Sequence, residues 1–315
     1  MNQPRVVCLG EALVDFVCEH PVATLADADV FVPRPGGSLP NIAVCAARFG
    51  ATVEILGGTG DDQWGRWVRD RIAAEAVEVQ RFKLLPGVAT SVAFVAVGPD
   101  GEPSFTFRGD PERPAAHAGD DLEPALSGDP GVLVLGSDTL LGDAERAVTM
   151  RAAAIASERG WQVLCDPNLR PERWPDQPTM VATIRDLVAV SAVVKLNEAE
   201  ARALTDAKSL ELGARELLGL GLGAVVVTCG GRGATLVTLK GVHTVAAREA
   251  KLVDATGAGD CVAGVLAAAM ARGTAPVDLA EALEAAMTAA AGVVSVWGAW
   301  DGLPAAAEAR AMLAG

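Results

Sequence analysis

One stretch of the sequence places small residues and an acid at the expected start of a helix. Asp254-Ala255-Thr256-Gly257-Ala258-Gly259-Asp260 runs directly into the apolar segment from Cys261 to Ala271. The backbone N–H groups of Gly257, Ala258 and Gly259 can approach an anion closely, and the helix dipole adds partial positive charge. Phosphoryl transfer needs such stabilisation and a base for the acceptor hydroxyl, and Asp260 can be that base. The alternative is a tight turn in which Asp260 only caps the helix.

A second constellation lies in the first forty residues and suits a polyhydroxylated ligand. The glycines of Gly36-Gly37-Ser38-Leu39-Pro40-Asn41 let the backbone approach a ligand, and Asn41 can both donate to and accept from sugar hydroxyls. Asp15 follows an apolar stretch and can accept two hydroxyl hydrogen bonds. The alternatives are a helix cap for Asn41 and a strand-end turn for Asp15.

Two further segments each follow an expected buried strand in the second half of the chain. Asn197-Glu198-Ala199-Glu200 opens a helix, where Asn and Glu also serve as N-terminal caps. The other segment is Thr228-Cys229-Gly230-Gly231-Arg232-Gly233. Its glycines permit close approach to a ligand. The alternative is a plain turn between a strand and a hairpin. No G-x-x-x-x-G-K-[ST] occurs, so a P-loop is excluded.

Together these segments resemble the two signatures of the ribokinase-like (PfkB) carbohydrate kinase family, in the right order and over essentially the whole chain. The resemblance implies an ATP-dependent kinase with Asp260 as its base. It implies sugar contacts from Asp15, Gly36, Gly37 and Asn41. It implies nucleotide contacts from Asn197, Thr228, Gly230, Gly231 and Gly233. Glu200 would act on Mg²⁺ through water, and Asp254 with Thr256 would suit a monovalent cation, which makes K⁺ an optional cofactor.

Within the family, three segments favour a fructokinase or a 2-keto-3-deoxygluconate kinase. They are Gly10 to Phe16, Asp166-Pro167-Asn168-Leu169-Arg170, and the closing Gly298 to Pro304. Arg108, on an expected lid, and Arg170 resemble substrate contacts, and two guanidinium groups would suit the carboxylate of a sugar acid. The chain has no Tyr, a residue common beside this Arg in the sugar-acid kinases, so we favour fructokinase. A non-catalytic sugar or nucleotide sensor is the alternative from another class.

The elements that must position these residues alternate along the second half of the chain. Apolar runs at 132–135, 162–165, 193–196 and 224–228 predict strands, and 143–159 and 179–190 predict the helices between them. This β-α-β order is typical of a parallel sheet, and we expect a three-layer α/β/α fold. The segment 219–224 matches a relaxed dinucleotide fingerprint but follows a helix and precedes a strand, so we interpret it as a loop.

The first half of the chain predicts a smaller sheet. Runs at 92–97 and 104–107 flank Pro99-Asp100-Gly101, a strong turn signal. With extended segments near 13–17 and 30–33 they predict a small antiparallel sheet, a lid formed by residues near 11–35 and 88–114. We expect one kinase domain over residues 1–315, and a homodimer through the lid is compatible with it.

Composition limits the partners. The formal net charge of -14 argues against nucleic acid and anionic membranes, and the partners we expect are a small sugar and ATP. Six cysteines without a C-x-x-C pair predict reduced thiols. The apolar stretch near the N-terminus is too short for a signal sequence, so we expect a cytoplasmic protein.

Overall fold

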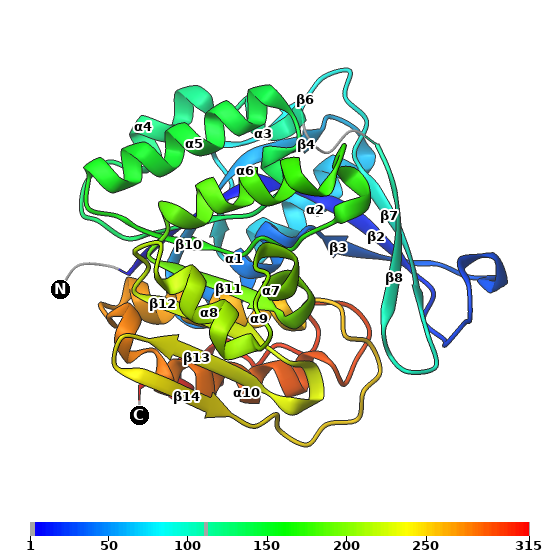
Figure 1. Cartoon of the computed structure of the whole chain (residues 1–315). Coiled ribbons are helices and arrows are strands. Elements are labelled where there is room, and N and C mark those ends of the chain that lie inside the picture. Colours follow the sequence, from blue (N-terminus) through cyan, green and yellow to red (C-terminus); the bar gives the residue numbers. More distant parts are fainter. Residues whose placement is uncertain (1–3, 110–112, 315) are drawn as a thin grey trace.

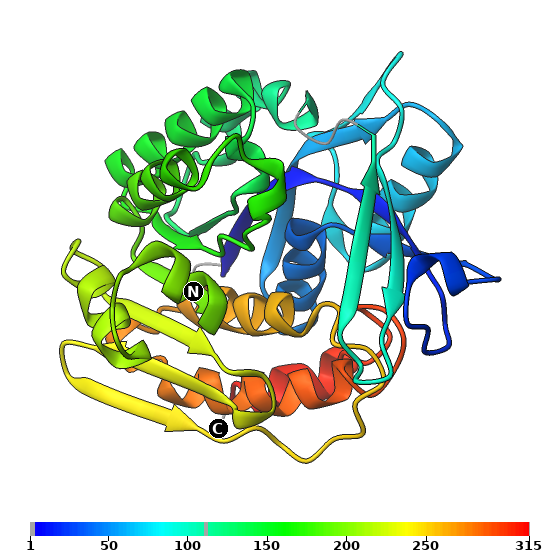
Figure 2. The ribbon, with the colours of Figure 1, turned by 45° about the vertical axis from the view of Figure 1, so that its right-hand side comes forward.

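The computed structural model describes residues 4–109 and 113–314 and has three layers. A large sheet lies in the middle, with α4, α5, α6 and α8 on one face and α1, α9 and α10 on the other (Figure 1). This arrangement confirms the predicted three-layer α/β/α fold class. The smaller sheet lies against one end of this body (Figure 2).

The strands alternate with helices as the sequence predicted. The strands are β1 (Arg5–Glu11), β2 (Leu13–Val17), β3 (Val32–Gly36), β4 (Thr52–Gly60), β5 (Val77–Glu78), β6 (Phe82–Leu85), β7 (Val92–Val97), β8 (Pro103–Arg108), β9 (Val132–Leu135), β10 (Gln162–Cys165), β11 (Val193–Asn197), β12 (Ala224–Thr228), β13 (Ala234–Thr238) and β14 (Gly241–Val245). The helices are α1 (Ser38–Arg48), α2 (Gln63–Ala74), α3 (Arg113–Ala116), α4 (Leu122–Ala125), α5 (Asp143–Glu158), α6 (Gln177–Ala189), α7 (Glu198–Leu204), α8 (Leu210–Leu218), α9 (Ala258–Ala271), α10 (Ala280–Val293) and α11 (Ala306–Met312). Residues 219–223 form the loop between α8 and β12, as expected.

The large sheet is buried on both faces because its central strands are apolar at nearly every position. In β1, Val6 and Cys8 belong to the core on the α1 and α9 side, whereas Val7 and Leu9 belong to the core on the α5 and α6 side. Successive side chains of a strand point to opposite faces, so a fully apolar strand needs cover on both sides.

The strand order brings one set of loops together. The order is β14-β13-β12-β11-β10-β9-β1-β4-β5, with β6 paired to β4, and all pairs from β12 to β4 are parallel. The chain leaves β1 toward β4 on one side and later returns to β9 on the other. Ligands of open α/β sheets bind where the carboxyl ends of the strands meet such a reversal.

The smaller sheet has the order β3-β2-β7-β8, so its four strands come from the predicted lid segments. The prediction that it is antiparallel is wrong for one pair, because β2 and β7 run parallel. The β7–β8 hairpin turns at Gly101, whose φ of +79° suits glycine. The predicted lid segment near 88–114 includes residues 110–112, which lie outside the described residues. Over residues 4–109 and 113–314, no helix has the length and apolarity needed to span a membrane.

Candidate active site

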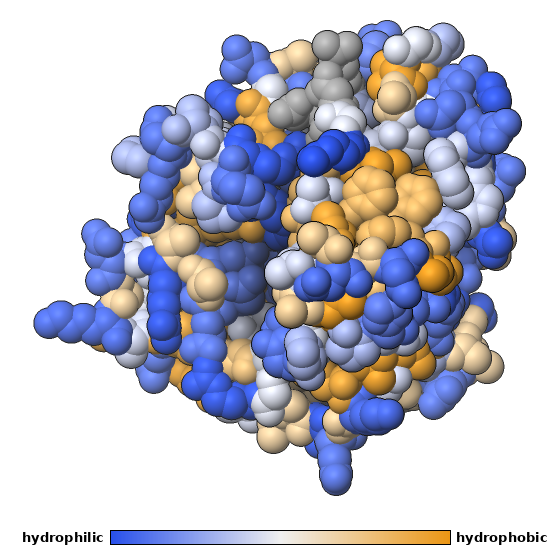
Figure 3. Space-filling model, turned by 90° about the vertical axis from the view of Figure 1, so that its right-hand side faces the viewer, coloured by the Kyte–Doolittle hydropathy of each residue, from blue (hydrophilic) through white to orange (hydrophobic). Residues whose placement is uncertain are grey.

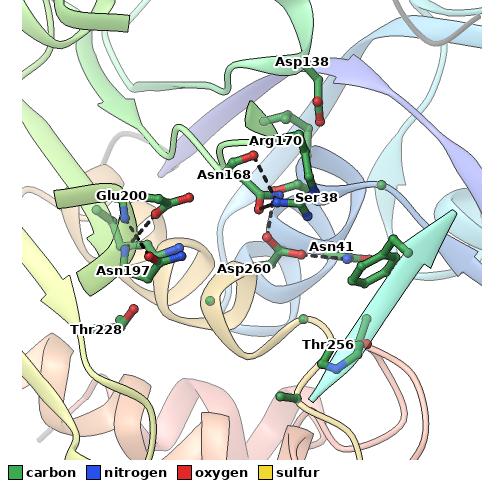
Figure 4. Close-up of a pocket in the computed structure, with 18 of the residues that line it drawn as sticks. Ser38, Asn41, Asp138, Asn168, Arg170, Asn197, Glu200, Thr228, Thr256 and Asp260 are labelled. Carbon is green, nitrogen blue, oxygen red and sulfur yellow. Dashed lines mark hydrogen bonds between the residues drawn. The ribbon is translucent and has the colours of Figure 1, made fainter. Parts of the chain in front are cut away.

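A cavity of ≈ 730 Å³ that many polar side chains line opens at the carboxyl ends of the parallel strands. Its walls come from the ends of β1, β11 and β12, from the starts of α1 and α9, and from the inner side of the smaller sheet. Figure 3 shows a hollow lined by hydrophilic residues on the side of the molecule that carries the smaller sheet. Figure 4 shows Asp260 in the middle of the cavity, with side chains from both halves of the chain around it.

Two side chains of α1 hold the Asp260 carboxylate. Ser38 Oγ donates to Asp260 Oδ1 at 2.7 Å, and Asn41 Nδ2 donates to Asp260 Oδ2 at 2.7 Å. Burial raises the pKa of Asp260, which makes it a stronger base, although these hydrogen bonds and the charges of Lys195 and Arg170 oppose that shift. The carboxylate is therefore fixed in position while part of it remains open to the cavity.

Trp300 fixes the orientation of the Asn41 amide. Its indole Nε1 donates to Asn41 Oδ1 at 2.7 Å, and the Trp300 side chain is buried. An indole N–H can only donate, so the amide oxygen must face Trp300 and the NH₂ group must face Asp260. Asn41 was predicted as a sugar contact; its side chain lies beside Asp260, and its Oδ1 and Nδ2 each already have a partner within the protein.

The residues before Asp260 form a tight helix start. Gly257 is the N-cap of α9 with φ +79°, and a Cβ there would lie 2.4 Å from the Cβ of Ala299. The first N–H groups of a helix have no intrahelical acceptor. The Ala258 N–H donates to the Ala255 carbonyl at 3.3 Å, which leaves the N–H groups of Gly257 and Gly259 to suit an anion in the cavity. Position 257 therefore requires glycine for its conformation and for space.

Asp254 organises the loop that leads into α9. The carboxylate is fully buried and accepts from Thr256 N at 2.9 Å and from Gly298 N at 2.9 Å. Thr256 Oγ1 is buried and has no hydrogen-bond partner among the described residues. A buried carboxylate and an unpartnered hydroxyl in one short loop are oxygen groups that fit a cation.

Asp15 points into the cavity from β2, and Gly36 makes room for it. A Cβ at Gly36 would lie 2.5 Å from the Asp15 carboxylate. Burial raises the pKa of Asp15 to about 7, with further increases from the charges of Asp254 and Asp260 and a decrease from Arg170. A ligand that donates hydroxyl hydrogen bonds to Asp15 would offset the cost of burying its negative charge.

The raised pKa of Asp15 predicts that the protein loses stability as pH rises, and that Asp15→Asn abolishes this loss. The unfolded carboxyl ionises near pH 3.8 and the folded one near pH 7, so the folded state binds the proton more tightly and stability falls as pH rises through that window. The Tm of Asp15→Asn relative to the original protein should therefore rise between pH 4.5 and pH 8. Asp70→Asn, at an exposed position of α2, should show no such trend; parallel Tm curves for Asp15→Asn would contradict the prediction.

The two predicted arginines differ in position. Arg170 lines the cavity, where its Nη1 donates to Asn168 Oδ1 at 2.8 Å, and its guanidinium lies 5.6 Å from the centroid of the Phe105 ring. Arg108 is exposed, donates to the carbonyl of Phe107, and does not line the cavity. The structure therefore brings Arg170, but not Arg108, to Asp15.

The residues predicted to bind the nucleotide and Mg²⁺ lie on the wall of the cavity formed by the ends of β11 and β12. Asn197 and Glu200 form a capping box at the start of α7, the alternative that the sequence left open. Glu200 Oε1 also accepts from Leu169 N at 2.8 Å, so both of its oxygens bind backbone N–H groups. Asn197, Glu200, Thr228 and Gly230 line the main cavity.

A second, more apolar cavity of ≈ 240 Å³ continues from this wall. It contains Gly231 and Gly233 together with side chains of α10 such as Met287 and Ala290. The sequence could indicate only the helix near 286–292 as an adenine contact. The loop at 247–252 forms the other side and carries no motif.

Three residues that the sequence reasoning did not select complete the site: Ser38, Lys195 and Trp300. Ser38 was part of the glycine-rich segment without a role. Lys195 and Asp166 form a buried ion pair, with Nζ 2.8 Å from Oδ2 and 3.0 Å from Oδ1. The sequence does contain a signal for Lys195, because it stands within an apolar run that predicts a buried strand. A lysine is rarely buried unless an acid pairs with it.

Comparison with known proteins gives consistent matches. The model of the pfkB family of carbohydrate kinases matches residues 3–306. Fructokinase-2 of Solanum lycopersicum is 30% identical over 98% of this chain and 96% of its own length. Aminoimidazole riboside kinase from Salmonella enterica, solved with aminoimidazole riboside and an ATP analogue, has a TM-score of 0.86 at 27% identity, covering 98% of this chain and 99% of its own. A fructokinase double mutant from Vibrio cholerae O395, with fructose, ADP and potassium ion bound, has a TM-score of 0.82 at 28% identity, covering 99% of both chains.

Proposed function

The chain belongs to the pfkB family of carbohydrate kinases and is an ATP-dependent enzyme, and we propose that it phosphorylates fructose with Asp260 as the general base. The observation that carries the proposal is the position of Asp260. It lies in the first turn of α9 and is bonded to Ser38 and Asn41 from the α1 side of the cavity.

In this proposal the acceptor sugar lies between Asp15 and Asp260. Asp260 takes the proton of one hydroxyl, whose oxygen attacks the γ-phosphorus of ATP. The N–H groups from Gly257 to Gly259 stabilise the charge of the transferring phosphoryl group. Closure of the smaller sheet would limit access of water and thus hydrolysis of ATP.

The charges at the sugar end favour a neutral sugar over a sugar acid. Asp15 and Glu11 line this end together with Asp138, whose charge Arg173 balances at 2.8 Å, whereas Arg170 is the cation that the described residues place there. Arg170 is already bonded to Asn168, and Arg108 lies outside the cavity lining. A carboxylate would meet more negative than positive charge, so 2-keto-3-deoxygluconate is the weaker candidate.

The second cavity suits the adenine of ATP. A Cβ at Gly230 or Gly231 would have no atom within 4 Å, so these two glycines leave space beside the cavity, and its α10 wall is apolar. Glu200 suits Mg²⁺ through water, because its oxygens already accept from backbone N–H groups and the ion keeps its hydration shell. Bound Mg²⁺ would neutralise charge on the phosphates of ATP.

Asp254 and the unpartnered Thr256 hydroxyl favour a monovalent cation in the loop before α9. The similar fructokinase from Vibrio cholerae contains a potassium ion. We propose K⁺ as an activator that stabilises this loop. Omission of KCl should then lower turnover, and an unchanged rate would remove this part of the proposal.

The outer side of the smaller sheet favours a homodimer. Phe16, Phe31, Phe94 and Trp64 form an aromatic cluster there, with ring centroids 5.2–5.6 Å apart, and Trp64 is 38% exposed. Figure 3 shows an apolar area on the side that carries this sheet. Exposed apolar patches mark interaction surfaces, and we predict the mass of two chains by light scattering, against a monomer for a Trp64→Glu variant.

The test of function is ADP release with Mg·ATP and a panel of acceptors. The panel contains fructose, 2-keto-3-deoxygluconate, ribose, adenosine and aminoimidazole riboside. The proposal expects the highest kcat/KM on fructose. A preference for the sugar acid would assign Arg170 as its carboxylate ligand, and a preference for a riboside would replace fructose as the acceptor.

A further inference from the structure

Lys195 places an ammonium group beside the helix start where the phosphoryl group is proposed to bind. It lies on β11, its side chain is 6% exposed, and it lines the main cavity. A Cβ added at Gly259 would be 2.9 Å from Lys195 Nζ. The ammonium is therefore in direct proximity to the first turn of α9.

The Asp166 carboxylate anchors Lys195 and leaves it a free donor. Both Asp166 oxygens accept from Nζ, at 2.8 and 3.0 Å. An ammonium has three N–H groups, so one remains for a ligand in the cavity. Burial works against the charged form, but the Asp166 and Glu200 carboxylates outweigh it and raise the pKa of Lys195, which keeps it protonated.

Acids outnumber cations in the lining of the main cavity, which favours a cation where phosphate groups bind. Among the described residues that line the main cavity, the acids are Glu11, Asp15, Glu102, Asp138, Glu198, Glu200 and Asp260, and the cations are Arg170 and Lys195. Asp138 and Glu198 are paired with arginines outside this lining, and the remaining acids would repel the phosphates of ATP. Lys195 lies beside α9, whereas Arg170 bonds to Asn168 on the sugar side.

The proximity of Lys195 also explains why position 259 is a glycine. Its φ is not positive, so its conformation does not require glycine, whereas any side chain there would meet the ammonium. Close approach of Lys195 to the helix start thus depends on position 259 as well as on Asp166.

We propose that Lys195 is a catalytic residue whose ammonium contacts the phosphoryl group during its transfer, with Asp166 as the positioning residue that holds it there. The inference rests on the proposed function. The acceptor oxygen bonds to the γ-phosphorus as the bond from that phosphorus to the bridging oxygen breaks. ADP leaves with the electron pair, Asp260 receives the hydroxyl proton, and Lys195 keeps all of its protons.

The experiment measures kcat and the sugar Kd with whichever acceptor the original protein phosphorylates, so an error about fructose does not affect it. Lys195→Met should lower kcat by about 10²–10³-fold and change the sugar Kd less than about threefold. Lys195→Arg should retain more activity, since it keeps the charge. The double variant Asp166→Asn/Lys195→Met leaves no unpaired buried acid, and it should recover Tm without recovering kcat.

Arg173→Met is the matched control for breaking an ion pair next to the cavity. Arg173 Nη1 lies 2.8 Å from Asp138 Oδ1, but Arg173 does not line the cavity. It should lose stability with kcat within a few-fold of the original protein. The proposal is overturned if Arg173→Met lowers kcat as much as Lys195→Met, or if the double variant turns over at the original rate.

The pH dependence of kcat tests the role of Lys195 independently. Lys195 and Arg170 face Asp260 as cations, while Asp15 and Asp166 face it as acids. Removing the Lys195 charge should shift the acid limb of the kcat profile to higher pH, because the base then protonates more readily. An unshifted limb with normal kcat would also overturn the proposal. Asp260→Asn measured alongside reports on the base separately.

Discussion

Asp260→Asn is expected to lower kcat by about 10²–10⁴-fold, the scale of a lost general base, while the sugar Kd changes far less. The amide cannot take a proton from the acceptor hydroxyl, yet it has nearly the shape of the carboxylate. It can still accept from Ser38 or Asn41 through its oxygen. Steady-state ADP release and calorimetric sugar binding on the same preparation measure the two quantities.

Ser38→Ala is the control for this prediction. It removes one hydrogen bond from the Asp260 carboxylate and leaves the base in place, so we expect a loss of about tenfold or less. Near-normal turnover in Asp260→Asn would exclude Asp260 as the base. Equal losses in both variants would mean that the orientation of the carboxylate matters more than its proton affinity.

Gly57→Ala is expected to destabilise the fold by about 4 kcal/mol, or roughly 10 °C in Tm. Gly57 lies in β4 opposite Gly10 of β1, with φ +116°. A Cβ there would lie 1.9 Å from the Gly10 carbonyl oxygen. Alanine would therefore require both an unfavourable backbone conformation and separation of two central strands.

Gly87→Ala separates these two causes. Gly87 has φ +79° but no atom within 4 Å of an added Cβ, so only the conformational cost of about 1 kcal/mol applies. Thermal unfolding of the two variants side by side should give a clearly larger loss for Gly57→Ala. Similar losses would show that β1 and β4 can move apart without cost.

The buried strands were the most predictable part of the fold. The predicted runs at 132–135, 162–165 and 224–228 coincide with β9, β10 and β12. Such segments are apolar throughout and bounded by polar or turn residues, so length and composition identify them locally. Strand direction in the smaller sheet was not predictable in this way. The parallel pair of β2 and β7 joins segments about 80 residues apart, and side-chain alternation is the same for either direction.

The site was predictable where a motif carries it and not where distant residues meet. Asp260 and Gly257 stand in one segment, and their positions at the start of α9 follow from that segment. Lys195 pairs with Asp166 29 residues away, and Trp300 bonds to Asn41 259 residues away. Arg108 was selected by its neighbours in sequence, but its side chain lies on the exposed side of β8.

The contact between Trp300 and Asn41 has a consequence for the order in which the chain is made. Ser38, Asn41 and Asp260 all precede Trp300 in the sequence and are therefore synthesised before it. Until its indole arrives, the Asn41 amide is free to turn its oxygen toward Asp260, where two acceptors would repel. A nascent chain on the ribosome thus acquires its oriented base only after Trp300 has been added and has packed against Asn41.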